Sequence, residues 1–94
     1  MIYAVIGFLK APPPAGDARF EAAVNDHLAP GFPRIINAGY LRGRDGERVG
    51  VLALIDVDTF EQAEGYLAES PFTELGLVED AHVAVFDVEV GRLG

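Results

Sequence analysis

The sequence predicts an α+β domain in which two helices cover one face of a four-stranded antiparallel sheet. Three observations predict it: four segments rich in β-branched and aromatic residues, two segments with apolar residues at helical spacing, and Pro- or Gly-rich breaks between them. Their order is strand, helix, strand, strand, helix, strand, which is the ferredoxin-like βαββαβ arrangement. With 94 residues and no sign of a second core, residues 1–94 are expected to form one domain.

The first strand is expected at residues 2–9, which are mostly β-branched, aromatic or otherwise apolar. It is expected to end near Lys10, because the prolines at 12–14 have no N–H group to donate to a sheet. The same run is shorter than the roughly 20 residues that a membrane-spanning helix needs, and no basic segment precedes it. We therefore expect neither a membrane span nor a signal peptide.

The first helix is expected to begin after Asp17, a typical N-cap residue, and to end before Pro30. Its apolar face repeats at positions i, i+3, i+4, i+7 and i+8. The residues on this face are Phe20, Ala23, Val24, His27 and Leu28. His27 is the polar member of this face, so its imidazole is expected to point toward the sheet and away from water.

A hairpin is expected next, with a weaker strand at residues 35–42, a Gly-containing turn at 44–47 and a strongly apolar strand at 49–57. Three basic residues surround the turn and alternate with acidic ones, which is typical of a solvated hairpin tip. These basic residues are Arg42, Arg44 and Arg48.

The second helix is expected to begin at Asp58, with Glu61 three positions later in a capping-box pattern. Its expected apolar stripe consists of Phe60, Ala63 and Leu67. Ser70 and Pro71 are expected to end it, because proline disfavours a helical conformation in the residue before it. The alternating residues 81–90 predict the last strand.

The predicted strands are apolar on both faces, whereas a sheet with helices on one side usually alternates apolar and polar residues. Both helices are already assigned to one face. The second face is therefore expected to pack against the sheet of another copy, giving a homodimer with the form of a dimeric α+β barrel. The alternative is a monomer with exposed apolar side chains, which are common on protein surfaces.

Composition excludes several classes of function. Seven basic residues against fifteen acidic ones give a net charge of −8, which disfavours nucleic acid and anionic membranes as partners. The absence of cysteine excludes disulfides and thiolate chemistry and suits a reducing cytoplasm. His27 and His82 are too few ligands for zinc, and no phosphate loop, dinucleotide fingerprint or serine-hydrolase elbow occurs. We therefore expect no metal and no cofactor.

Short motifs in the second half of the chain match those of a known family. They are Gly39 before a short strand segment, Asp45-Gly46 in the hairpin, Gln62-Ala63-Glu64, Ser70-Pro71-Phe72 and Gly76-Leu77-Val78. His27-Leu28 also stands where that family has a His-Leu pair near the end of its first helix. By these motifs the chain resembles the YciI-like family, small proteins of the dimeric α+β barrel fold. The family usually has Asp where this chain has Ser70.

The resemblance implies a small-molecule site between the first helix and the sheet. In the family the helix histidine and a nearby aspartate are proposed as a polar pair, and some relatives are implicated in dehydrochlorination or lactone isomerisation. For this chain it implies a cofactor-free lyase or isomerase with His27 as general base and Ser70 in the place of the acid. Arg34, Tyr40 and Phe72 are expected near the ligand, with Phe72 also in the core.

Two alternatives accompany this hypothesis. An unperturbed imidazole titrates near pH 6.5 and can contribute about 10²- to 10⁴-fold as a base, but His27 could instead be a structural residue bonded to a carbonyl near a helix end. Ser70 cannot carry the charge of an aspartate and is also a natural helix-terminating residue. The rival function is therefore a noncatalytic binding or assembly module with a vestigial pocket.

Overall fold

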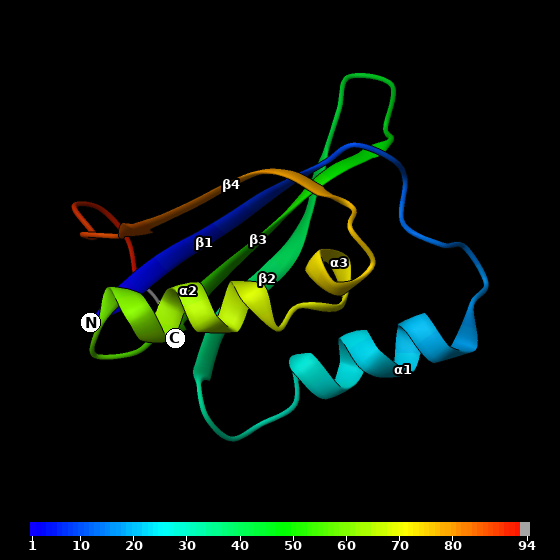
Figure 1. Cartoon of the computed structure of the whole chain (residues 1–94). Coiled ribbons are helices and arrows are strands. Elements are labelled where there is room, and N and C mark those ends of the chain that lie inside the picture. Colours follow the sequence, from blue (N-terminus) through cyan, green and yellow to red (C-terminus); the bar gives the residue numbers. More distant parts are fainter. Residues whose placement is uncertain (93–94) are drawn as a thin grey trace.

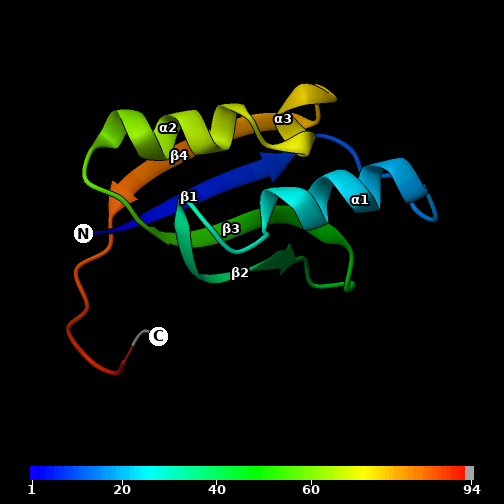
Figure 2. The same ribbon diagram turned by 90° about the horizontal axis from the view of Figure 1, so that it is seen from below.

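Four antiparallel strands form one sheet in the order β2-β3-β1-β4 in the computed structural model of the chain, which describes residues 1–92 (Figure 1). All three helices lie on the same side of this sheet (Figure 2). The elements are β1 Ile2–Leu9, α1 Ala18–His27, β2 Arg34–Arg42, β3 Arg48–Asp56, α2 Phe60–Ala68, α3 Pro71–Glu74 and β4 Val78–Val85. The predicted ferredoxin-like α+β fold is confirmed.

The core lies between the central strands β1 and β3 and the helix α2. Tyr3 and Val5 of β1 pair with Ile55 and Ala53 of β3, and these four side chains point toward the helices. Alternate residues of a strand face opposite sides of a sheet, so the even-numbered residues of β1 face the side without helices. The core cluster consists of Tyr3, Val5, Ala53, Ile55, Val57, Ala63 and Tyr66.

The strand boundaries agree with the predictions to within one residue, except for the last strand. β1 has its predicted bounds, β2 and β3 begin one residue earlier than predicted, and β3 ends one residue earlier. β4 begins three residues earlier, at Val78, and ends at Val85, so its predicted extension to residue 90 is wrong. The last bond along this edge joins the Phe86 N–H to the Ile2 carbonyl at 2.8 Å, and β1 offers no partner beyond Ile2.

The first helix begins as predicted. The Asp17 carboxylate accepts hydrogen bonds from the backbone N–H groups of Arg19 and Phe20 at 3.0 and 3.1 Å. These bonds satisfy two of the N–H groups that have no partner within a helix. The helix ends at His27, with Leu28 as its C-cap, before the connector that contains Pro30.

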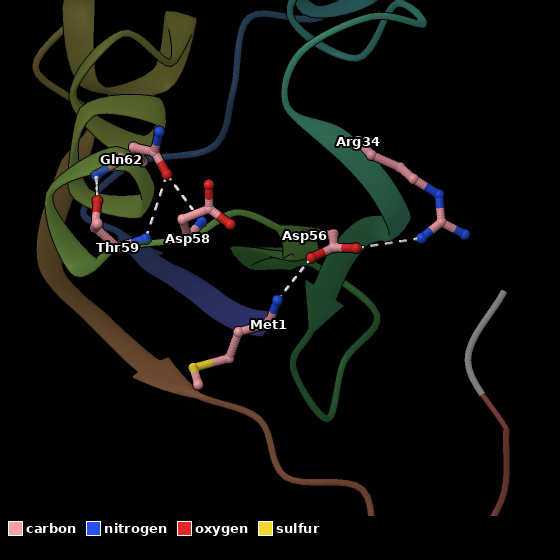
Figure 3. A network of polar contacts seen from close by, with 6 residues as sticks. All are labelled: Met1, Arg34, Asp56, Asp58, Thr59 and Gln62. Carbon is pink, nitrogen blue, oxygen red and sulfur yellow. Dashed lines mark hydrogen bonds and ion pairs between the residues drawn. The ribbon is translucent and has the colours of Figure 1, made fainter.

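The predicted start of the second helix is wrong by one residue. The N-cap is Thr59, whose hydroxyl accepts a hydrogen bond from the Gln62 N–H at 3.1 Å. The Gln62 side-chain oxygen in turn accepts from the N–H groups of Thr59 and Asp58 at 3.2 and 2.8 Å (Figure 3). Thr59 with Gln62 therefore forms the capping box that the sequence suggested for Asp58 with Glu61.

Ser70 ends the second helix only indirectly, because it caps a further helical turn. α2 ends at Ala68, and the Ser70 hydroxyl accepts a hydrogen bond from the Phe72 N–H at 3.2 Å, which starts the short helix α3. Pro71 occupies the first position of α3, where its missing N–H costs nothing. The predicted end of the second helix is thus followed at once by a one-turn helix.

Replacing Thr59 by alanine should lower the free energy of unfolding by about 1 kcal/mol, because it removes the side chain that caps α2. Asp58→Ala is the matched control, since the Asp58 group in the capping network is its backbone N–H. Urea denaturation of the two variants measures the difference. A larger loss for Asp58→Ala than for Thr59→Ala would contradict the assignment of the cap.

Candidate functional site

A cavity of about 290 Å³ lies among α1, α2, α3 and the helix-covered face of the sheet. Its walls are mostly aliphatic, with side chains such as Val5, Val24 and Leu67. Four lining residues of the described chain have polar side chains, and none carries a fixed charge. These four are His27, Tyr40, Tyr66 and Ser70.

The cavity exists because α1 is attached to the other helices more than to the sheet. Toward its start, the Phe20 ring packs edge-on against Phe72 of α3 with the centroids 5.1 Å apart. At its end, the Tyr66 hydroxyl of α2 donates a hydrogen bond to the His27 carbonyl at 3.0 Å. Between these contacts Val24 is the residue of α1 that lines the space, and Ala23, predicted to face inward, is exposed.

The His27 imidazole is turned inward, as its position on the helix predicted. It stacks on the Tyr66 ring with the centroids 4.0 Å apart and the planes 16° from parallel. Its Nε2 atom is buried and makes no hydrogen bond within residues 1–92. His27 is a lining residue of the apolar cavity, and a buried polar atom without a partner is uncommon in folded proteins.

Burial lowers the pKa of His27 below its usual value of 6.5, because removal from water disfavours the charged form. The carboxylates of Glu69 and Glu74 and a backbone interaction with Tyr66 act in the opposite direction and offset this only in part. Burial also raises the pKa of Tyr66 to about 12. At neutral pH His27 is therefore an uncharged acceptor, and Tyr66 stays protonated as a hydrogen-bond donor.

Ser70, Phe72 and Tyr40 all line the same cavity as His27. Ser70 is 5% exposed, and because its oxygen accepts from the Phe72 N–H, its hydroxyl proton remains free to be donated. Phe72 is buried, as predicted, and meets the Tyr40 ring edge-on at 5.9 Å. The Arg48 guanidinium lies 4.1 Å from the centre of the Tyr40 ring.

The structure does not bring Arg34, also predicted near the ligand, together with this group. Its side chain pairs with Asp56 at 3.5 Å, and Asp56 also binds the Met1 amino group at 2.8 Å (Figure 3). The register of the β2–β3 hairpin places Arg34 opposite Asp56, six residues along β2 from Tyr40. At 3.2–3.4 Å per residue this separation is roughly 20 Å.

Three further residues that could assist a histidine, Asp56, Asp26 and His82, lie away from the cavity. Asp56 is held by Met1 and Arg34 and does not line the cavity, and Asp26 is exposed on α1. His82 pairs with Asp80 at 3.1 Å, and its register opposite Ile6 places it on the other side of the sheet from His27. Within residues 1–92 no group of three His, Cys, Asp or Glu side chains could hold a metal ion.

Tyr66 is the site residue that the sequence analysis missed. Its signal was present, because Tyr66 follows Ala63 by three positions and therefore lies on the inward face of α2. The predicted apolar stripe of this helix contained Phe60, Ala63 and Leu67 and passed over the tyrosine beside Leu67.

Comparison with known proteins relates this fold to an enzyme structure. No family model matches the chain, and no curated protein matches it in sequence. A solved structure with a similar fold is 5-chloro-2-hydroxyhydroquinone dehydrochlorinase (TftG) from Burkholderia phenoliruptrix AC1100, in complex with 2,5-dihydroxybenzoquinone. The TM-score is 0.72 over 93% of this chain and 94% of that chain, at 18% sequence identity. The two chains therefore share a fold along almost their whole length.

The described part of the chain contains no helix with the length and apolar character needed to cross a membrane.

We expect stability to fall as the pH drops from about 7 through 6.5, with a contribution from His27. The unfolded chain takes up a proton near pH 6.5, whereas the folded chain, whose His27 pKa is lower, resists it. The free energy of unfolding therefore decreases as the pH falls from 6.5 to the folded pKa of His27, and the contribution of His27 stays lost below that pH. Urea denaturation at several pH values should show a weaker dependence in His27→Gln than in wild type. The control is the same substitution at the other histidine, His82→Gln. If the free energy of unfolding depends on pH as strongly in His27→Gln as in wild type, burial of the His27 imidazole is contradicted.

Proposed function

We propose that the chain is a YciI-like protein that binds a small organic molecule in the cavity beside His27 and acts on it as a cofactor-free lyase or isomerase. The observation that carries this proposal is an uncharged imidazole that lines an apolar cavity and whose Nε2 atom is buried and has no hydrogen-bond partner among the described residues. A base needs a free lone pair at working pH, and a water-poor site keeps the proton on the intended path.

The proposed reaction begins with transfer of a carbon-bound proton, next to a carbonyl, from the ligand to His27 Nε2. The electron pair of the broken C–H bond moves into the carbonyl group, giving an enolate and an imidazolium. In an isomerisation, the imidazolium returns the proton to a different carbon. In a lyase reaction, the enolate electrons form a C=C bond and break the bond to a leaving group such as chloride on the neighbouring carbon, and the imidazolium releases its proton to water. The Ser70 hydroxyl is the nearby neutral donor that stabilises the enolate oxygen.

The cavity size supports a ligand with one ring. An apolar cavity of about 150 Å³ is enough to hold benzene, and this cavity measures about 290 Å³. Phe72 and Tyr40 supply aromatic surface, and His27 and Ser70 supply the polar contacts. A substituted aromatic ring or a lactone-like acid fits this description. The dehydrochlorinase with the similar fold was solved with such a one-ring molecule, 2,5-dihydroxybenzoquinone.

Replacing His27 by alanine should weaken the binding of 2,5-dihydroxybenzoquinone by about tenfold or more, because a hydrogen bond to a buried ligand group is lost. Isothermal titration calorimetry measures this change. Arg34→Ala is the matched control and should bind as wild type does, since Arg34 pairs with Asp56 away from the cavity. Equal affinity of wild type and His27→Ala would rule out the proposed site.

The noncatalytic alternative is favoured by one observation: within residues 1–92 the cavity lining contains no carboxylate that could assist His27. The two functions differ in what happens after binding. A β,γ-unsaturated butenolide conjugates its double bond when a base moves a proton, and this change is followed by ultraviolet absorbance. Acceleration that disappears in His27→Ala supports the enzyme, whereas binding without acceleration supports the binding module.

We also propose that the protein is a cytoplasmic homodimer that pairs through the side of the sheet without helices. Most residues of β1 and β3 on this side are apolar, with the charged Asp56 at one end opposite Ile2, and the Phe8 side chain is 40% exposed. The apolar residues form a continuous group. They are Ile2, Ala4, Ile6, Phe8, Leu52 and Leu54. A second copy seated on them would remove this apolar surface from water.

Light scattering should give twice the mass of the chain for wild type and the mass of one chain for Ile6→Glu, because the new carboxylate would be buried in the interface. Leu75→Glu is the control, since Leu75 is exposed beside α3 on the helix-covered side. A wild-type mass equal to one chain would exclude the dimer.

A further inference from the structure

Tyr66 makes two separate contacts with His27. It lies in α2 and is 7% exposed. Its ring stacks on the imidazole at 4.0 Å between centroids, and its hydroxyl donates to the His27 carbonyl at 3.0 Å. One contact fixes the side chain of His27 and the other fixes its backbone. Both join residues that are 39 positions apart in the sequence.

The hydrogen bond secures the end of α1. His27 is the last residue of this helix, and the last four carbonyl groups of a helix have no partner within it. The following turn closes by bonds from the Leu28 N–H to Val24 and from the Ala29 N–H to Asp26. The His27 carbonyl receives the Tyr66 hydroxyl instead. The tyrosine therefore fixes the position from which the imidazole projects.

The stacking contact restricts the imidazole itself. The second side-chain torsion of histidine has broad minima, so an isolated imidazole can turn over a wide range. A parallel ring at 4.0 Å limits this rotation to orientations that keep the two planes together. In that orientation Nε2 is buried beside the cavity with no protein partner in the described chain.

Histidine bases in enzymes are commonly held by a third group, often a carboxylate that also stabilises the imidazolium. No lining residue in the described chain offers a carboxylate. We propose that Tyr66 is the positioning residue for His27, and that it orients the imidazole by stacking and by its hydroxyl without adding charge. This inference rests on the proposed function, because it assigns how that function's base is held. The phenol stays protonated and so brings no charge to the imidazole.

Two variants separate the two contacts. Tyr66→Phe keeps the ring and removes the hydroxyl, whereas Tyr66→Leu removes both. The control is Tyr3→Phe, a buried tyrosine of the same core whose ring packs on Phe60 and not on His27. In Tyr66→Phe, hydrogen exchange of the Leu28 and Ala29 amides should become about tenfold faster, because the end of α1 loses its tether. Tyr3→Phe should leave their exchange, measured relative to global unfolding, unchanged.

In Tyr66→Leu, NMR titration should show the His27 pKa moving back toward 6.5, because a released imidazole reaches water. The butenolide isomerisation should lose about tenfold or more in kcat with a smaller change in KM, since the base is no longer aligned. An unchanged His27 titration in Tyr66→Leu, or unchanged amide exchange in Tyr66→Phe, overturns the inference. Should Tyr66→Leu fail to fold, the exchange measured in Tyr66→Phe decides alone.

The outcome also separates this inference from the proposed function. If the His27 pKa changes in Tyr66→Leu but wild type does not isomerise the butenolide, the positioning role is supported and the enzymatic function is excluded. If isomerisation requires His27 but the His27 pKa is the same in Tyr66→Leu as in wild type, the enzymatic function is supported and the positioning role is overturned.

Discussion

The attachment of α1 to the other two helices is the constraint on which the rest of the site depends. Phe20 holds one part of this helix to α3, and His27 holds its end to α2. The residue between them that faces the sheet is Val24, which is too small to fill the space beneath the helix. The cavity is thus a direct result of two aromatic contacts and one short side chain.

The same attachment determines the chemistry available at the site. The His27 imidazole is withdrawn from water but receives no bond at Nε2 from the described residues, so it remains uncharged and free to accept a proton. The Ser70 hydroxyl oxygen accepts the hydrogen bond that starts α3. Its proton is still available for donation, and Ser70 lines the cavity. Acid-base potential here comes from burial and geometry more than from neighbouring charges.

Local sequence signals were sufficient for the fold and for the direction in which His27 points. The strand β1 follows from the composition of residues 2–9, and the start of α1 follows from the cap at Asp17. Both are short-range features, and both were predicted correctly. The end of β4 depends on where β1 begins, and the location of Arg34 depends on hairpin register. Neither relation can be read from neighbouring residues. Thr59 and Asp58 are both residue types that cap helices, and the bond from the Gln62 N–H to the Thr59 hydroxyl identifies Thr59 as the cap.

The residues that line the cavity are spread along the sequence from Val5 in β1 to Phe72 in α3, and include residues of α1, β2 and β3. Its walls come together only when these segments are folded, so a molecule bound there would interact with the folded state and not with the unfolded one. Occupancy is therefore linked to global folding, and a ligand at one hundred times its dissociation constant adds about 2.7 kcal/mol to stability. In a domain of this size, that linkage makes the melting temperature a sensitive reporter for ligand screening.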